Sequence, residues 1–185
     1  LWSVKLDVVF EPVVGMRPSL VCWDREDGTQ VRHWPLEGIT FDGSAHTVSQ
    51  TRDWVILSDS GNFKADPGEM FGGERTATIE KAVPVWLIRK EALDGLPSGT
   101  PVASVCFTMA PPSGHFYARW DDTDGISVVW EGMDLMDLGL YLRPDDLDVN
   151  GRPVDPAVAG LYNMAMAPET ITAVVFDPES GKVLE

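Results

Sequence analysis

The sequence has few basic residues and only two cysteines, and both shortages exclude classes of protein. It holds 14 Lys and Arg against 29 Asp and Glu among 185 residues, a net charge of −15. Nucleic acids and anionic lipids are bound through clustered Lys and Arg, so the acidity argues strongly against a nucleic-acid binder and against electrostatic docking on anionic lipid. Cys22 and Cys106 are too few for a disulfide framework or a zinc site, and we expect two buried free thiols.

A membrane helix and a signal peptide are also missing. The longest stretch without formal charge, residues 95–118, contains four prolines and cannot form a membrane helix. Residues 1–13 alternate in polarity and carry Lys5 and Asp7, so they lack the basic start and apolar block of a signal peptide. We therefore expect a cytoplasmic protein.

Strand-forming segments dominate what is present. The 14 prolines and 17 glycines are spread along the chain, which favours many short strands over long helices. The best helix candidate is residues 156–166, residues 90–94 could form a single turn, and residues 62–76 are typical of a long loop. The fold class is thus predicted to be all-β. Strands are predicted at residues 4–10, 19–23, 31–34, 54–58, 83–89, 102–109, 115–120, 126–130 and 171–176.

One pattern occurs three times, in residues 23–31 (WDREDGTQV), 120–128 (WDDTDGISV) and 176–183 (FDPESGKV). Each reads as a hairpin in which Asp opens the turn through its side chain and Gly takes the positive-φ position. If the first interval spans two units, the period is about 50 residues, as in propeller blades. The alternative is three unrelated hairpins with common turn chemistry. A propeller would use this chain for about three or four blades.

The three histidines stand in different surroundings. Nothing near His33 suggests a ligand shell, and we expect it to be structural or exposed. His46 follows a small-residue turn and precedes a strand that contains Trp54. His115 follows the turn PPSG and opens a strand with aromatic residues, an acidic pair and a tight turn.

These two segments resemble the carotenoid cleavage oxygenase family, which includes the retinoid isomerase of the eye and stilbene-cleaving dioxygenases. Residues 45–55 (AHTVSQTRDWV) are similar to the family segment His-Asp/Ser-Phe-x-x-Thr-x-x-Tyr-x-Val, with Val for Phe and Trp for Tyr. Residues 115–122 (HFYARWDD) resemble His-x-x-Asn-Ala-Trp/Tyr-Glu-Glu and depart from it at Ala118 and Arg119. The separation of His46 and His115, 69 residues, also resembles the family spacing.

The resemblance implies a seven-bladed β-propeller in which four histidines bind one ferrous iron, Fe(2+), on the axis. His46 is then similar to the second metal ligand and His115 to the third. The first and fourth ligands, and the carboxylates that orient the ligands, would lie outside the chain, so none is assigned. Residues 1–185 are expected to form a single segment of the propeller, incomplete at both ends.

The implied activity is that of an iron-dependent dioxygenase. It would use O2 to cleave a conjugated C=C bond in a carotenoid, apocarotenoid or stilbene-like substrate held in an apolar tunnel. These residues do not distinguish cleavage from isomerisation, and they do not select one substrate. Peripheral membrane contact of the full-length protein is compatible with the resemblance.

Several side chains have a structural interpretation beside the functional one. Trp54, Phe116, Tyr117 and Trp120 are candidates for the tunnel, but propeller core packing is favoured for them. Asp121 and Asp122 could suggest an acid–base pair, but a solvated turn is favoured.

The alternative function is that of a non-catalytic β-propeller interaction module. In that protein the two histidines would lie on outer strands or point apart. In an iron enzyme their imidazoles should lie within a few Å of a common point.

Overall fold

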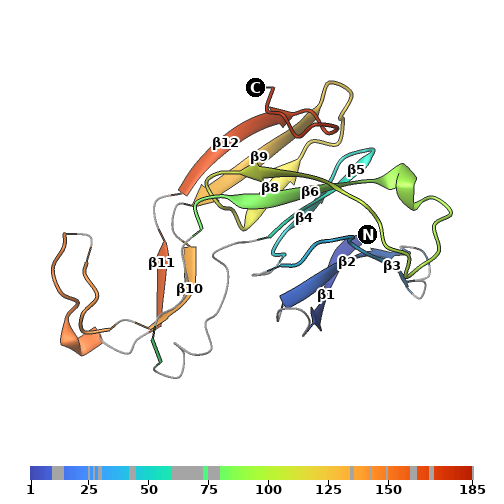
Figure 1. Ribbon diagram of the computed structural model, residues 1–185. Helices are drawn as coiled ribbons and strands as arrows, with labels where there is room; N and C mark the ends of the chain where they lie inside the picture. The colour runs from blue at the N-terminus through green and yellow to red at the C-terminus, as the bar shows by residue number, and fades with distance from the viewer. Residues whose placement is uncertain are drawn as a thin grey trace.

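A computed structural model gives the structure of the chain, and Figure 1 shows its arrangement. It describes residues 1–9, 15–24, 26, 28, 31–41, 45–59, 73–74, 80–133, 136–141, 143–148, 150–158, 162–166 and 169–184. The predicted loop at residues 62–76 lies almost entirely outside the described residues. Within the described part, no helix is both long and apolar enough to cross a membrane.

The fold is all-β, as predicted, and its described regular elements are strands and two short 3-10 helices. The three-stranded sheet β1–β2–β3 is followed by the four-stranded sheet β4–β5–β6–β7, the three-stranded sheet β8–β9–β12 and the pair β10–β11. All pairings within these sheets are antiparallel. The strands are β1 (Trp2–Val9), β2 (Gly15–Trp23), β3 (Val31–Pro35), β4 (Val48–Gln50), β5 (Trp54–Ser58), β6 (Val83–Arg89), β7 (Val105–Met109), β8 (His115–Ala118), β9 (Ile126–Met133), β10 (Met136–Tyr141), β11 (Tyr162–Met166) and β12 (Glu169–Phe176), and the 3-10 helices are η1 (Lys90–Leu93) and η2 (Pro156–Val158).

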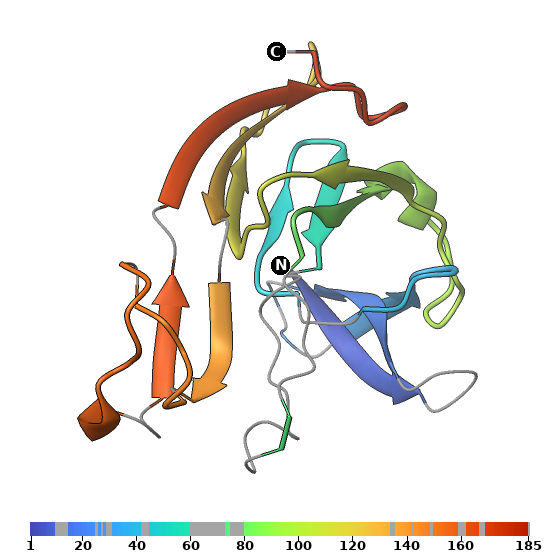
Figure 2. The same cartoon turned by 60° about the vertical axis from the view of Figure 1, so that its left-hand side comes forward.

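The three larger sheets follow one another in an open arc (Figure 2). Strand β4 contacts β1 on one side and β8 on the other, so the first strand of each sheet lies beside the first strand of the next. The described sheets do not close into a ring. The first strands of neighbouring sheets are therefore the place where residues distant in sequence can meet.

The middle sheet is buried on both faces, and this forms the core. Along β5, Val55 and Leu57 belong to the cluster shared with β1–β2–β3, whereas Trp54 and Ile56 belong to the cluster shared with β8–β9–β12. All five residues of β5 are buried. Because successive strand residues face opposite sides, a continuous apolar run is what a strand covered on both faces requires.

Most sequence predictions of strands are confirmed, two of them to the residue in β5 and β6, and the turn at residues 90–94 is found as η1. The helix predicted at residues 156–166 is wrong. Its beginning forms only η2, and its end forms β11, which pairs with β10. Pairing with a strand some 25 residues away thus overrode the local helix signals of Pro and Ala.

The three predicted hairpin turns are confirmed. The Oδ1 atoms of Asp24, Asp121 and Asp177 accept hydrogen bonds from the backbone N–H two residues later, at 2.8, 3.2 and 2.8 Å. The turn glycines all have positive φ: 64° at Gly28, 113° at Gly125 and 67° at Gly181. The repeated pattern therefore encodes one kind of turn at three places in the fold.

Two of these glycines differ in their surroundings, which leads to a stability prediction. A Cβ added at Gly181 would lie 2.6 Å from Phe107 Cβ, whereas one at Gly28 would have no atom within 4 Å. Gly28→Ala should lower the free energy of unfolding by only about 1 kcal/mol, the cost of placing alanine in the left-handed backbone conformation. Gly181→Ala adds a clash with Phe107, a partly buried aromatic residue that packs against the core, and we expect a total loss of about 2 kcal/mol in free energy of unfolding. Urea denaturation of both variants measures this difference, and equal losses would contradict it.

The cysteines are free, as predicted, but their expected burial is wrong for Cys106. Cys22 is half-buried and Cys106 is exposed. Cys106 lies on β7, at the edge of the four-stranded sheet, where alternate residues face outward. Partial burial still raises the pKa of its thiol.

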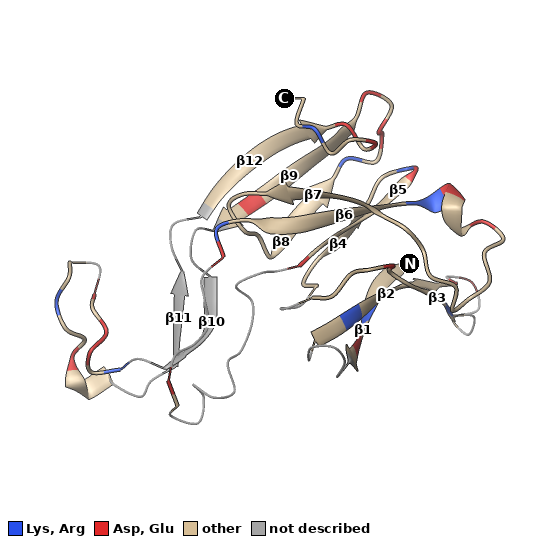
Figure 3. Cartoon of the chain, viewed as in Figure 1, with Lys and Arg blue, Asp and Glu red and all other residues tan. Residues whose placement is uncertain are grey.

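Charged residues lie mainly in turns and at strand ends, away from the sheet interiors (Figure 3). This is the distribution expected of a solvated acidic surface. An acidic side chain inside a sheet or against the core is therefore an exception that needs an explanation, and two such carboxylates are Glu131, within β9, and Asp122, which is buried.

Candidate metal centre

The structure brings His46 and His115 together. His115 is the first residue of β8, and His46 lies two residues before β4. Their Nε2 atoms are 3.1 Å apart, and their ring centroids are 4.9 Å apart with a tilt of 58°. The predicted approach of the two imidazoles is thus found, although 69 residues separate them. The alternative in which they point apart does not describe this arrangement.

Hydrogen bonds between the first strands of two sheets fix this approach. Strands β4 and β8 belong to different sheets. The side-chain links between them, Thr47 to Gly114, Ser49 to Ala118 and Thr51 to Asp122, advance in the same direction along both segments. The Thr47 hydroxyl donates to the Gly114 carbonyl at 2.5 Å, and the Ala118 N–H donates to Ser49 Oγ at 2.8 Å. The side chains of Thr47 and Ser49 thus bind the backbone at the start and the end of β8. Each histidine is adjacent in sequence to the first of these links.

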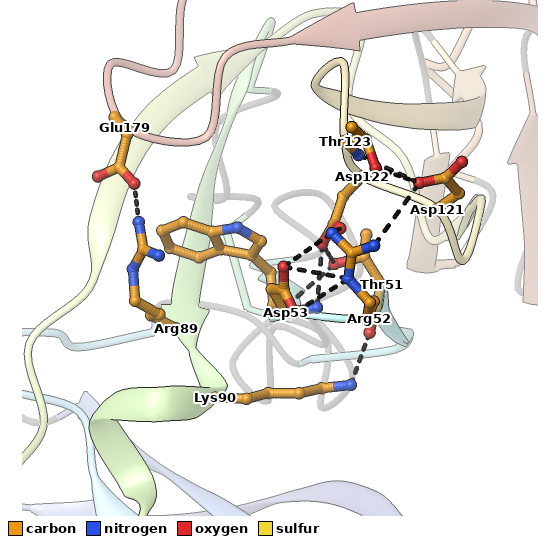
Figure 4. A network of polar contacts seen from close by, with 10 residues as sticks. Thr51, Arg52, Asp53, Arg89, Lys90, Asp121, Asp122, Thr123 and Glu179 are labelled. Atoms are coloured by element: carbon orange, nitrogen blue, oxygen red, sulfur yellow. Dashed lines mark hydrogen bonds and ion pairs between the residues drawn. The ribbon is translucent and has the colours of Figure 1, made fainter.

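A buried carboxylate closes the other end of the same junction. Asp122 Oδ2 accepts hydrogen bonds from Thr51 Oγ1 at 2.5 Å and from the Asp53 N–H at 3.0 Å, and Arg52 Nη2 lies 3.1 Å from its Oδ1. Figure 4 shows these residues gathered around Asp122. The side chain of Asp122 is only 2% exposed, so its assignment to a solvated turn is wrong, whereas that of Asp121 is 54% exposed. The neighbouring sheet buries Asp122, which its own turn residues could not indicate.

The electrostatics of this carboxylate follow from its contacts. Burial would raise the pKa of Asp122, but the hydrogen bonds from Thr51 and Asp53 and the charge of Arg52 outweigh burial and hold it below the ordinary value. Asp122 therefore stays ionised and acts as an acceptor. It holds the ends of β4 and β8 together rather than transferring protons.

Lys90 supports the junction from the adjacent helix η1. Its Nζ donates to the Thr51 carbonyl at 2.6 Å and to Gln50 Oε1 at 2.8 Å, and it lies 4.8 Å from the centroid of the Trp120 ring. Burial lowers the pKa of Lys90 despite the attraction of Asp122. Trp120 therefore has a cation–π role on the outside of the junction.

The turn that precedes β8 fixes the backbone of His115 through hydrogen bonds. Ser113 Oγ accepts from the His115 N–H at 3.0 Å and donates to the His115 carbonyl at 2.6 Å. Ser113 is buried, and the Trp130 indole N–H donates to the Pro111 carbonyl at 2.8 Å, which ties the same turn to the core. His115 thus begins its strand at a position fixed on both sides.

A carboxylate that the sequence analysis did not assign touches His115. Glu131 Oε2 lies 2.5 Å from His115 Nδ1, and the two residues are directly opposite on β8 and β9. The signal that could have found Glu131 is the hairpin itself. The predicted turn pairs Ala118 with Val128, and the same register continued along the strands pairs His115 with Glu131.

The two histidines fit a metal ion. Ligand nitrogens about 2.1 Å from one ion and adjacent in its coordination shell lie about 3 Å apart, and Nε2 to Nε2 is 3.1 Å here. Iron(II) accepts imidazole ligands. In the part of the chain that the structure describes, no group of three or more His, Cys, Asp or Glu is placed to hold a metal ion. Among the described residues, these two histidines could therefore supply two ligands to a metal ion and no more.

The other candidate residues lie away from this pair or in the core. Trp54 and Phe116 are buried in the core, as the packing interpretation predicted. Core packing is wrong for Tyr117 and Trp120, whose side chains are exposed. His33 lies on β3, where its Nδ1 is 3.1 Å from Ser98 Oγ, and takes no part in the site.

A groove lies on the sheet β8–β9–β12 and is not lined by either histidine. It has a volume of about 600 Å³, is largely apolar, and is lined by residues of β8, β9 and β12, including Tyr117, Val129 and Ala173. Alternation along β8 and β9 places these side chains on the face of the sheet that carries His115 and Glu131.

Comparison of the chain with known protein families, with characterised proteins and with solved structures finds no match.

Proposed function

We propose that the chain belongs to a non-haem iron(II) dioxygenase that cleaves a conjugated C=C bond of a carotenoid, apocarotenoid or stilbene-like substrate with O2. The observation that carries the proposal is the 3.1 Å separation of His46 Nε2 and His115 Nε2. If the two histidines met by chance, nothing would have to hold their backbones in place. Here, hydrogen bonds of Thr47 and Ser113 fix the backbone beside each ring.

The proposed fold is part of a β-propeller. In support, three antiparallel sheets follow one another, with their first strands side by side. Each sheet would be one blade, and β1, β4 and β8 would be the inner strands. The apolar outward face of β8–β9–β12, with Tyr117 and Ile171 exposed, would be the contact surface of a further blade.

The residues present would bind the ion and leave it accessible. His46 and His115 would each direct an Nε2 lone pair at Fe(2+), from two strands that hydrogen bonds hold in register. When bound, the iron supplies activation of O2 beside the substrate. The overall reaction balances without an added reductant: the C=C and O–O bonds break, and two C=O bonds form in two carbonyl products.

Copper(II) is a suitable probe because imidazole binds it more strongly than other divalent first-row ions. With one equivalent of Cu2+, we expect the electron paramagnetic resonance spectrum to show hyperfine coupling to two imidazole nitrogens. His46→Ala or His115→Ala should remove one coupled nitrogen and weaken Cu2+ binding at least about tenfold, because even the loss of a group that only hydrogen-bonds to a metal ligand has an effect of that size. His33→Ala is the matched control and should change neither measurement. A spectrum unaffected by either site variant would contradict the proposed site.

A second measurement tests the activity. Because this chain contributes two histidines to a four-histidine site, we expect weak Fe2+ binding and no cleavage of a carotenoid or stilbene by the 185 residues alone. Aldehyde formation is followed by chromatography under air with added Fe2+. Robust turnover would contradict the four-ligand assignment. Two-nitrogen binding with no turnover agrees with it.

A further inference from the structure

We propose that Asn150 is a site of spontaneous deamidation by water, and that the carboxylate of Asp148 slows the reaction. The inference does not rest on the proposed metal site. Asn150 and Gly151 form the only Asn–Gly pair in the sequence, and both residues are exposed. They lie at the tip of a small hairpin that the bridge between Leu147 and Pro153 closes. This hairpin belongs to the orange segment between β10 and β11, which projects away from the three larger sheets (Figure 1).

The reaction joins two neighbouring groups of the chain. The Gly151 backbone nitrogen loses its proton to solvent and attacks Asn150 Cγ, and the new C–N bond closes a cyclic imide. The bond from Cγ to Nδ2 breaks, and Nδ2 takes up a proton and leaves as ammonia. Water then adds to either imide carbonyl and breaks its C–N bond, which yields aspartate or isoaspartate. No atom is oxidised or reduced, and water is the only co-reactant.

The surroundings of Gly151 leave its nitrogen open to this reaction. A Cβ added at Gly151 would have no atom within 4 Å. Because glycine has no side chain, nothing at this residue stands between its nitrogen and Asn150 Cγ. A bulkier residue would cover that approach, and a buried one would keep out the water that takes the proton and opens the imide. Asn150 therefore combines the residue type, the neighbour and the exposure that the reaction needs.

The side chain of Asp148 holds the same pair in a closed turn. Its Oδ1 accepts hydrogen bonds from the backbone N–H groups of Asn150 at 2.8 Å and Arg152 at 3.0 Å. Its Oδ2 accepts from Arg152 Nε at 3.0 Å and lies 3.5 Å from Asn150 Nδ2. The Gly151 N–H donates to the Asp148 carbonyl at 2.9 Å. The attacking nitrogen and the amide are thus both engaged with Asp148, and the turn must open before they react.

Deamidation removes the contacts that close the turn. Hydrogen bonds from Arg152 and Asn150 outweigh burial and hold the pKa of Asp148 below its ordinary value, so this carboxylate is ionised. The reaction places a second carboxylate beside it, where Asn150 Nδ2 had been a donor. Isoaspartate also adds a CH2 group to the main chain, which moves the Gly151 N–H off the Asp148 carbonyl. The reaction therefore opens the turn and does not reverse.

The first test locates the reaction. The parent chain is incubated at pH values on either side of neutrality, and peptide mapping by mass spectrometry follows the replacement of the side-chain NH2 by OH. We expect conversion at Asn150 to both aspartate and isoaspartate, and slower conversion at Asn62 and Asn163, which precede bulkier residues. The rate should rise with pH, because the attacking nitrogen must lose its proton. An intact Asn150, or equal rates at the three asparagines, would overturn the proposal.

The second test measures the restraint by Asp148. Asp148→Ala removes the acceptor, and we expect Asn150 to react about fivefold faster, the change in open population that loss of one hydrogen bond gives. Asp145→Ala, the matched control, makes the same change at an exposed neighbouring aspartate and should keep the parent rate. Asp148→Ser retains a weaker acceptor and should give an intermediate rate, and it decides the outcome if circular dichroism shows the alanine variant unfolded. An unchanged or slower rate in the Asp148 variants would overturn the role of the carboxylate.

Discussion

Replacing Asp122 with alanine is expected to lower the free energy of unfolding by about 3 kcal/mol. The change leaves the buried Thr51 hydroxyl and the partly buried Asp53 N–H without their acceptor, and an unsatisfied buried group costs about 1–3 kcal/mol. Arg52 is half exposed and adds little, because water can replace its partner. Equilibrium urea unfolding, followed by tryptophan fluorescence, measures the loss.

Asp121 is the matched control, because it is adjacent in sequence and carries the same charge but is exposed. Asp121→Ala loses a turn contact with Thr123, and we expect a cost of about 0.5 kcal/mol. If the two alanine variants were equally stable, Asp122 would not link the sheets. Asp122→Asn keeps the shape and one oxygen that can accept both bonds but loses the charge beside Arg52, so its stability should lie between those of the two alanine variants.

The stabilisation by Asp122 depends on pH with a definite sign. Its pKa is lower in the folded chain than in the unfolded chain, where the pKa of an aspartate is about 3.9. The stabilisation is therefore fully present above the unfolded value and is lost as pH falls through the folded value. The difference in stability between the parent chain and Asp122→Asn should shrink below about pH 4. A difference that grew on acidification would contradict the assignment.

Features encoded within a few residues were predictable from the sequence. The Asp–Gly turns of the three hairpins depend on a side chain reaching a backbone group two residues on, and all three occur. Strands β5 and β6 were predicted with their correct bounds because the middle sheet is covered on both faces and its strands are continuous apolar runs. Strand β4, only three residues long, has no such signal.

Features that depend on neighbouring sheets were not predictable in the same way. Asp122 appears as one more turn residue in the sequence, and only Thr51, 71 residues away, makes it a buried acceptor. The predicted helix failed because β10 supplied a pairing partner for β11. The approach of His46 and His115 was predicted only through a family resemblance, and Glu131 was missed although hairpin register alone would have placed it opposite His115.

The second large effect is expected at Trp130, beside Glu131 in β9. Trp130 is 2% exposed, its ring is stacked on Phe116 with centroids 5.4 Å apart, and its indole N–H binds the Pro111 carbonyl. Trp130→Ala removes one of the largest fully buried side chains and leaves a cavity in the cluster that it shares with Trp54 and Phe116. We expect a loss of about 4 kcal/mol in free energy of unfolding, within the range of about 3–5 kcal/mol for such truncations.

Trp120→Ala is the matched control for Trp130, since it removes an equal volume from an exposed position. Trp120 is 58% exposed and contacts Lys90 through its ring face, which is worth about 0.5–1 kcal/mol. Trp130→Phe separates packing from the hydrogen bond, because it keeps an aromatic ring but leaves the Pro111 carbonyl without its donor. That carbonyl belongs to the turn in which Ser113 holds His115, so Trp130→Phe should weaken Cu2+ binding at the histidine pair more than Trp120→Ala does. Equal copper affinity in the two variants would mean that the turn keeps its position without the hydrogen bond from the Trp130 indole to the Pro111 carbonyl. Ser113 and Thr47 alone would then fix His115.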